Sequence, residues 1–268
     1  MKNLIKALNY QIRRDNVTYY AYISGIAVLI LLFVTDVSGN SFNLTGSEYF
    51  FRSMAGVGSI SSILFFFSIL VTRICGWDYS DKTINYQIFA GHSRNSVFWS
   101  RIRVSFFTCV PSAVLIFFIL PPVILSLKNG WGISMDIDGV LLRCFICLFI
   151  ILRIYSECVF FAFITKSCYT GLITSFLYLY IGVNVFSMLS GDSHEKTSMI
   201  SVCSSLLNYT EVMNFNDYDF QYIDGVDEMV ADSAIEPSYA LVTIMASLLV
   251  SAASVLFSWN NFRRADMK

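Results

Sequence analysis

Six long apolar stretches constrain this chain more than any other feature of its sequence. A helix needs about 20 mostly apolar residues to cross the hydrocarbon core of a bilayer. Of the 268 residues, 56% are hydrophobic and only 14% are charged, which leaves too little polar surface for a soluble globule. The sequence therefore predicts an all-α membrane protein, one domain over residues 1–268, with six transmembrane helices. The predicted spans are residues 17–34, 50–74, 104–127, 139–164, 169–188 and 239–259.

The distribution of lysine and arginine predicts how these spans are oriented, because both residues are enriched in cytoplasmic loops. They gather before the first span, in residues 75–103, after the fourth span and at the C-terminus. The short loops on the opposite side, 35–49 and 128–138, contain a single basic residue, Lys128. We therefore expect both termini in the cytoplasm of a cell with the chain in its plasma membrane, which requires an even number of spans.

Residues 1–16 predict an amphipathic helix ahead of the first span. Leu4, Ile5, Leu8 and Ile12 recur on one helical face, and the basic side chains lie off it. This pattern is typical of a helix that lies in the membrane interface and contacts lipid. The alternative is a cytosolic helix packed on a partner.

Residues 189–238 form a long and acidic outer loop before the last span. It contains ten Asp and Glu residues and only one lysine, Lys196. A connection of this length usually has structure or a function of its own. It is either a solvated acidic cap or a gate or docking surface for a cationic substrate.

The cytoplasmic segment 75–103 predicts a short exposed helix. Asp78 can cap its start and Gly91 can end it. Between them Ile84, Ile88 and Phe89 make a small apolar face. Such a helix can dock into a groove of another protein, or it can be a linker that packs on its own bundle.

The same segment resembles a known family. Asp78-Tyr-Ser-Asp-Lys-Thr-Ile84, Gly91-His-Ser93-Arg94 and the later Arg101 are similar to the signature of ATP-binding-cassette (ABC) type-2 permeases, with Asp78 where Glu is commoner and Lys82 in place of the usual Gly. The ending 262–268 is similar to family members as well. The resemblance also covers the order of the interfacial helix, six spans, coupling helix and outer loop.

This resemblance implies a role and partners. Two such subunits pair as a homodimer or heterodimer, and each docks on a separate ATPase subunit that carries the ATP and Mg. Residues 78–91 would be the coupling helix. No phosphate-binding loop is present in this chain, so no cofactor is expected on it. The implied ATPase-coupling residues are Asp78, Thr83, Ile84, Ile88, Phe89, Gly91, Ser93 and Arg94.

Charged side chains inside the predicted spans are a second group of candidates. Arg153 and Glu157 are four residues apart and share a helical face. An unpaired charge at this depth costs about 2.5–3.5 kcal/mol, so we expect an ion pair. It is either a structural link between spans or a substrate or gating contact. Arg143 is nearer the outer end and can snorkel.

Small hydroxyl residues line one face of the sixth predicted span, which favours close packing or a polar wall of a translocation path. They are Thr243, Ser247, Ser251, Ser254 and Ser258. Because spans two and five commonly line the path in the resembling family, the path candidates are Ser59, Ser62, Thr174, Tyr178 and Asn184. Pro111, Pro121 and Pro122 predict a bend in the third span.

The same features argue against several other function classes. A net charge of −1 argues against nucleic acid. Cys144 and Cys147 have the spacing of metal ligands, but no second pair of Cys or His residues accompanies them. This favours thiols packed in the core over a metal site. An intramembrane hydrolase is disfavoured because His92 and His194 fall in loops on opposite sides.

We therefore expect a non-enzymatic permease subunit of an ABC transporter that exports or expels an antimicrobial peptide or drug. The alternatives are a stand-alone membrane transporter and an immunity protein without ATPase coupling.

Overall fold

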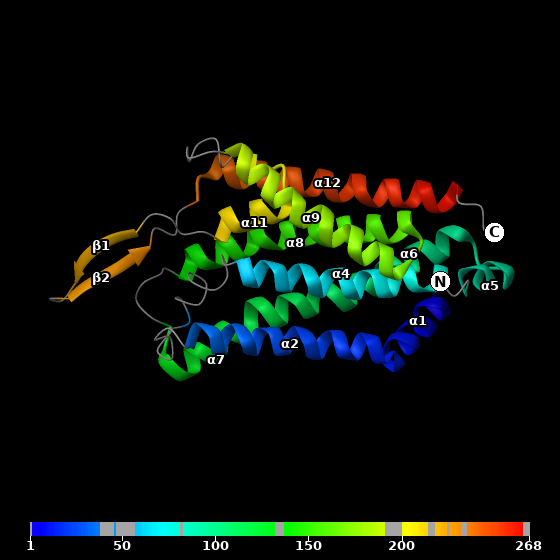
Figure 1. The fold of residues 1–268 in the computed structure, drawn as a ribbon, viewed down its shortest axis with the longest axis horizontal. Coiled ribbons are helices and arrows are strands. Elements are labelled where there is room, and N and C mark those ends of the chain that lie inside the picture. Colours follow the sequence, from blue (N-terminus) through cyan, green and yellow to red (C-terminus); the bar gives the residue numbers. More distant parts are fainter. Residues whose placement is uncertain are drawn as a thin grey trace.

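The computed structural model describes residues 2–37, 46, 57–80, 83–131, 137–190, 200–213, 218–223, 226–231 and 235–264. Its long helices run side by side along one axis (Figure 1). The N-terminal half contains α1 (Lys2–Arg14), α2 (Asn16–Val37), α4 (Val57–Ser80), α5 (Thr83–Phe89), α6 (Arg94–Ala113), the π-helix η3 (Val114–Ile119) and α7 (Leu120–Asn129). The C-terminal half contains α8 (Ile137–Thr165), α9 (Cys168–Ser190), α11 (Ser205–Met213), the strands β1 (Tyr218–Ile223) and β2 (Val226–Ala231), and α12 (Pro237–Arg264).

Four helical segments of the described chain are long and apolar enough to cross a membrane. They are Arg94–Asn129, Asp138–Thr165, Cys168–Phe186 and Pro237–Arg264, and the shorter apolar segment Ile63–Trp77 accompanies them. This architecture is that of a helical membrane protein. The predicted spans 104–127, 139–164, 169–188 and 239–259 all fall within or largely within these segments.

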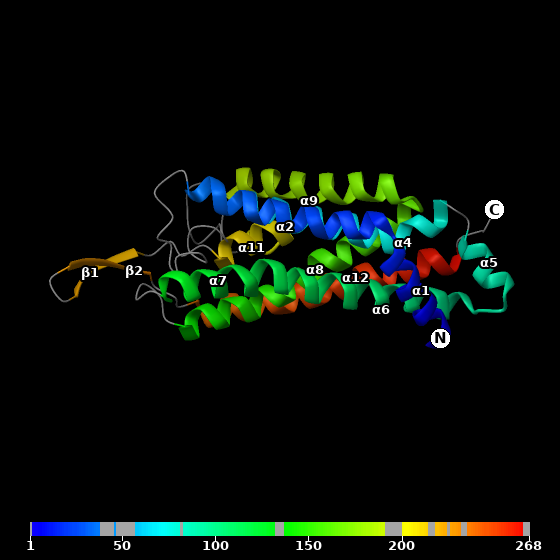
Figure 2. The same cartoon turned by 90° about the horizontal axis from the view of Figure 1, so that it is seen from below.

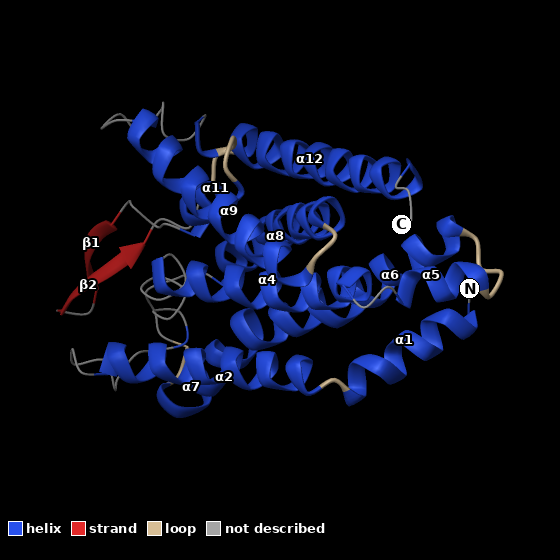
Figure 3. Ribbon diagram, turned by 45° about the vertical axis from the view of Figure 1, so that its right-hand side comes forward, coloured by secondary structure: helices blue, strands red, loops and turns tan. Residues whose placement is uncertain are grey.

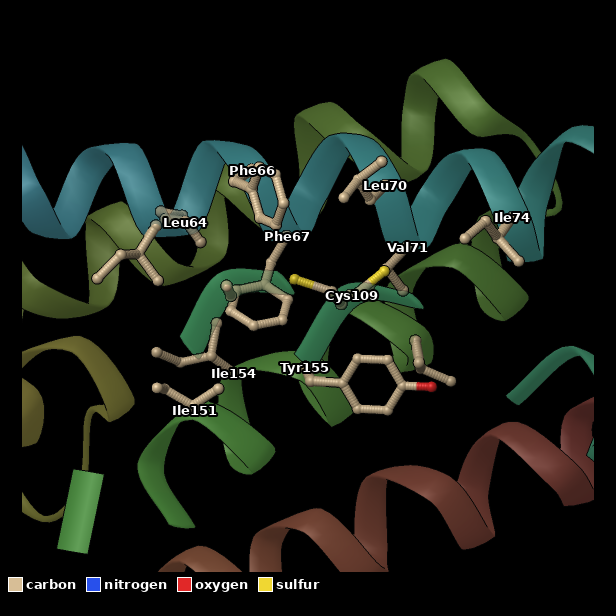
Figure 4. Close-up of a cluster of buried hydrophobic side chains, with 14 of the residues drawn as sticks. Leu64, Phe66, Phe67, Leu70, Val71, Ile74, Cys109, Ile151, Ile154 and Tyr155 are labelled. Carbon is tan, nitrogen blue, oxygen red and sulfur yellow. The ribbon is translucent and has the colours of Figure 1, made fainter. Parts of the chain in front are cut away.

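The core of the bundle lies where α4, α6 and α8 meet. Figure 4 shows Phe67 and Val71 of α4, Cys109 of α6, and Ile154 and Tyr155 of α8 pointing into the same space, and all five are buried. The Tyr155 hydroxyl donates to the Ile102 carbonyl at 2.9 Å, so the one polar atom of this group is satisfied. Since α8 contacts α4, α6, α9, α11 and α12, it is the central helix of the fold.

The third predicted span is one continuous but irregular helix. Pro111 lies inside α6, and Pro121 and Pro122 fall in the first turn of α7. Between these prolines the chain adopts the π-helix η3. A proline removes one backbone donor from the helix ladder. The prolines predict a bend here, and the structure shows a π-helical segment between them.

The segment 189–238 differs from the predicted outer loop in two ways. Residues 200–213, here called the inserted segment, fold back into the bundle, where Leu206, Tyr209 and Met213 of α11 are buried against α8 and α9. The strands β1 and β2 then form an antiparallel hairpin in which Tyr218 pairs with Ala231. The all-α prediction therefore holds for the bundle and misses this hairpin, which projects beyond the bundle in Figure 1.

The two ends of the bundle are different in character. The start of α1, the short helix α5 and the end of α12 lie together at one end, and the β-hairpin extends from the other (Figure 1). Helix α1 turns away from the direction of α2 (Figure 3). Its apolar face is buried, with Leu4 and Leu8 in the core, while Arg13 and Arg14 are exposed. The amphipathic pattern of residues 1–16 is confirmed, and part of its apolar face packs on protein.

Candidate functional site

An ion pair lies buried in the middle of the chain's central helix. Arg153 Nε and Glu157 Oε1 are 3.1 Å apart, and both side chains are almost fully buried. The other two guanidinium nitrogens donate to the carbonyls of Val202 at 2.8 Å and Cys203 at 3.0 Å. The Ser205 hydroxyl donates to the second carboxylate oxygen of Glu157 at 2.7 Å. The predicted pair therefore forms, and it also holds the start of the inserted segment.

A second arginine of α8 holds the other end of the inserted segment. Arg143 is buried and donates from Nη1 to the Val212 carbonyl at 2.7 Å. The prediction that Arg143 snorkels outward is wrong, because α11 supplies an acceptor within the bundle. Two guanidinium groups ten residues apart on one helix thus bind the backbone at both ends of α11.

Hydroxyl groups continue this polar network to α12. The hydroxyls of Ser201 and Tyr239 are 3.0 Å apart, and Tyr239 donates to Asn208 Oδ1 at 2.9 Å. Thr243 donates to the same oxygen at 3.3 Å. The inserted segment therefore links α8 to α12 by hydrogen bonds as well as by packing.

The hydroxyl face of α12 packs inward, where α12 meets α8. Thr243, Ser247, Ser251 and Ser258 are all buried. Small side chains at these positions let two helix backbones approach closely. This burial agrees with the packing interpretation of that face.

Helix α5 has an inner and an outer side. Ile84 is buried and Ile88 packs against the core, whereas Tyr86 and Phe89 are exposed, Phe89 with 86% of its surface. Gln87 accepts a hydrogen bond from Arg101 Nη2 at 3.1 Å. The predicted apolar face of Ile84, Ile88 and Phe89 is thus divided, because the two isoleucines contact the bundle and only Phe89 points outward.

The residues that flank α5 fix it to neighbouring helices. Thr83 begins α5, and the side chain of Asp78 lies outside the described residues. Gly91 has a φ of +88°, a conformation that glycine adopts without steric cost. Ser93 caps α6 by accepting from the backbone nitrogen of Ser96 at 3.2 Å. Arg94 donates from Nη1 to the Arg263 carbonyl at 2.9 Å, which joins this segment to the end of α12.

The translocation-path candidates lie on two helices, α4 and α9. The side chains of Ser59 and Ser62 lie outside the described residues. On α9, Thr174 donates to the Thr170 carbonyl at 2.7 Å and Asn184 donates to the Tyr180 carbonyl at 2.9 Å. Tyr178 and Asn184 are exposed on this helix, which runs along the edge of the bundle opposite to α7 and α12 (Figure 2).

An ion pair that the sequence pattern did not predict lies at the junction of α1 and α2. Asp15 separates the two helices and accepts from Arg73 Nε at 2.8 Å and Nη2 at 2.7 Å. The Thr18 hydroxyl donates to Asp15 at 2.9 Å, and the Arg73 guanidinium lies 3.4 Å from the centre of the Trp77 ring. The hydrogen bond from Arg73 holds the pKa of Asp15 below its ordinary value of 3.8. This contact, here called the elbow clamp, fixes α1 to α4.

We expect Asp15→Asn to loosen α1 while leaving the bundle intact, because it removes the charge from a bidentate pair. Hydrogen–deuterium exchange of α1 should become several times faster at neutral pH. A carboxylate with a depressed pKa stabilises the fold above its unfolded pKa and loses that effect as the pH falls through the folded one. The difference between wild type and variant should therefore begin to shrink below about pH 4 and vanish once the pH has fallen below the depressed pKa of Asp15.

Asp138→Asn is the matched control for this change, since Asp138 is exposed at the start of α8. Equal exchange of α1 in the wild type and Asp15→Asn at neutral pH would contradict a role for the elbow clamp.

Comparison with models of known protein families, with curated proteins and with solved structures gives no match. Among the described residues, no three His, Cys, Asp or Glu side chains gather as a metal site would require. Cys144 and Cys147 are free thiols, one half-buried and one buried.

Proposed function

We propose that this chain is the permease subunit of an ABC transporter that exports or expels an antimicrobial peptide or drug, powered by a separate ATPase subunit. The observation that carries the proposal is helix α5. It presents the exposed aromatic side chains of Tyr86 and Phe89 and is anchored behind by buried Ile84. It lies within the segment whose residues are similar to the signature of type-2 permeases.

The proposal includes six spans, two more than the four long apolar segments. Helices α2 and α4 contain 22 and 24 residues. At a rise of about 1.5 Å per residue they extend about 33 and 36 Å, against a hydrocarbon core of about 30 Å. Six spans bring both termini to one side of the membrane, in keeping with α1 and the end of α12 lying at the same end of the bundle (Figure 1).

The contacts of α5 suit a helix that transmits movement. Phe89 is the outward contact, and the hydrogen bonds of Gln87 with Arg101 and of Arg94 with Arg263 join the segment to α6 and α12. The Ser93 cap fixes the start of α6 directly behind it. A force applied by a partner at Phe89 would therefore reach two long helices through short connections.

A second permease subunit has an exposed surface available to it on α9. Ile173, Tyr178 and Val185 are among the large side chains that this helix exposes. Tyr178 and Asn184 would line a path only if another subunit faced this side of the bundle. The pairing of two permease subunits is thus part of the same proposal.

We expect Phe89→Ser to abolish co-purification of the ATPase subunit and to reduce transport-coupled ATP hydrolysis at least about tenfold, since a central aromatic anchor typically contributes 2 kcal/mol or more to an interface. Membrane insertion and thermal stability should not change, because the side chain makes little contact with its own bundle. The measurement is pull-down of a co-expressed ATPase, with ATPase assay in proteoliposomes.

Leu127→Ser is the matched control, since Leu127 is 84% exposed at the end of α7, away from α5. Retained ATPase binding by Phe89→Ser would exclude α5 as the docking element, and loss of binding in both variants would indicate a general effect of removing an exposed apolar side chain.

A further inference from the structure

A cavity of about 390 Å³ opens beside the elbow clamp, between the last turn of α1, the start of α2 and the end of α4. Its polar wall includes Arg14, Asp15 and Arg73, and its aromatic wall includes Tyr10 and Trp77. Leu8, Ile12 and Ile74 form the apolar part. The cavity is large enough for part of a small ligand and combines charge with apolar surface, as ligand sites do.

Both arginines of the cavity keep donors that no other described residue accepts. Arg73 gives Nε and Nη2 to Asp15, and its Nη1 has no hydrogen-bond partner among the residues that the structure describes. The Arg14 guanidinium lies 4.8 Å from the centre of the Tyr10 ring and donates no hydrogen bond to another described residue. With Asp15 neutralising one positive charge, the cavity carries a net charge of +1. An anion is therefore the ligand that this wall would select.

The position of the cavity indicates which anion. Helix α1 is amphipathic, and the cavity lies where α1 ends and the apolar helix α2 begins. An amphipathic helix next to an apolar one is typical of a membrane interface, and Tyr and Trp are the aromatic residues favoured there. A ligand here would meet two guanidinium groups and the apolar side chains of Leu8, Ile12 and Ile74. A free phosphate ion matches only the guanidinium groups.

We propose that this cavity binds the phosphodiester of a glycerophospholipid from the leaflet on which α1 lies, with an anionic headgroup preferred. Arg14 and the free Nη1 of Arg73 would bind the phosphate, and the glycerol end of the acyl chains would contact the apolar wall. A bound lipid would then brace the junction of α1 and α2 together with the elbow clamp. The site depends on the chain being embedded in a membrane and does not depend on an ATPase partner.

Native mass spectrometry of the full-length chain in mild detergent tests this proposal. The probes are phosphatidylglycerol, phosphatidylcholine, inorganic phosphate and glycerophosphoglycerol. The wild type should retain phosphatidylglycerol most strongly, and Arg14→Gln should weaken its retention about five- to tenfold, the effect of losing a charge-assisted hydrogen bond at a partly exposed site. Arg13→Gln is the matched control, because it removes the same charge from the same turn outside the cavity.

Three results would overturn the site. Equal weakening by Arg13→Gln and Arg14→Gln would mean a diffuse electrostatic attraction. Equal occupancy by inorganic phosphate or glycerophosphoglycerol at the same concentration would mean an anion site without lipid selectivity. Unchanged retention in Arg14→Gln would mean that the lipid binds elsewhere. None of these results bears on ATPase docking, which is measured separately at Phe89.

Discussion

Replacing Arg153 with methionine is expected to destabilise the folded chain by about 3–5 kcal/mol, because removing one partner of a buried ion pair leaves the other charge uncompensated. The Glu157 carboxylate would keep only the hydrogen bond from Ser205. The carbonyls of Val202 and Cys203 would lose their donors in the same change. Protonation of Glu157 can relieve part of the charge penalty, which favours the lower end of the range.

This variant is measured by reversible unfolding in bicelles, with Arg13→Met as the matched control. Arg13 is exposed on α1, so its replacement should change stability by less than about 0.5 kcal/mol. Glu157→Gln keeps the size of the side chain but leaves the buried Arg153 guanidinium without its counter-ion, so it should also destabilise the fold. Its cost should be smaller than that of Arg153→Met, because Arg153 keeps its hydrogen bonds to the carbonyls of Val202 and Cys203. A stable Arg153→Met protein that has lost transport would contradict the structural role and would support a substrate or gating contact.

The long helices and this ion pair were predictable because both depend on local sequence. An apolar run of about 20 residues specifies a long helix whatever surrounds it. The prediction of 239–259 falls inside α12 at Pro237–Arg264, and that of 169–188 inside α9 at Cys168–Ser190. Arg153 and Glu157 meet because residues four apart share a helical face. None of these results needs information about neighbouring helices.

The inserted segment was missed because its burial depends on distant partners. Helix α11 has only nine residues, too few to register as a span, and it lies in a stretch dominated by acidic residues. An apolar pattern that could have predicted this burial is present in the sequence, at Leu206, Leu207, Val212 and Met213. What fixes them inside the bundle is Arg143 and Arg153 on α8, more than 45 residues away, as the separations of their hydrogen bonds show. The elbow clamp joins Asp15 and Arg73 across a similar gap of 58 residues.

In helix α5, the helical repeat predicts which side chains share a face, but it does not predict which face the bundle covers. Ile84 and Ile88 are four residues apart, so their shared face follows from the helix repeat. Phe89 is one residue further, about 100° around the helix, and it points away from the bundle. The face that the bundle covers depends on how α4 and α6 position α5 between them. The pattern of apolar residues in α5 alone does not determine this.

Replacing Phe67 with alanine is expected to cost about 3 kcal/mol, the lower end of the range for this change in a protein core. Phe67 is fully buried and points from α4 toward Ile154 of α8 (Figure 4). The helices of a membrane protein remain in lipid when they separate, so little transfer free energy is lost. The remaining cost comes from the cavity and from lost dispersion contacts.

Phe65→Ala is the matched control that separates the energy of packing from that of membrane insertion, because it removes another phenylalanine side chain, two residues away on the same helix. Phe65 is 42% exposed and faces outward, where lipid can fill the space left by its ring. Its replacement should cost less than about 1 kcal/mol, although both changes lower the hydrophobicity of α4 equally. Unfolding in bicelles therefore separates packing from insertion. Equal losses in the two variants would mean that α4 does not present Phe67 to α8, whereas a large loss confined to Phe67→Ala would place the core of the folded protein between these two helices.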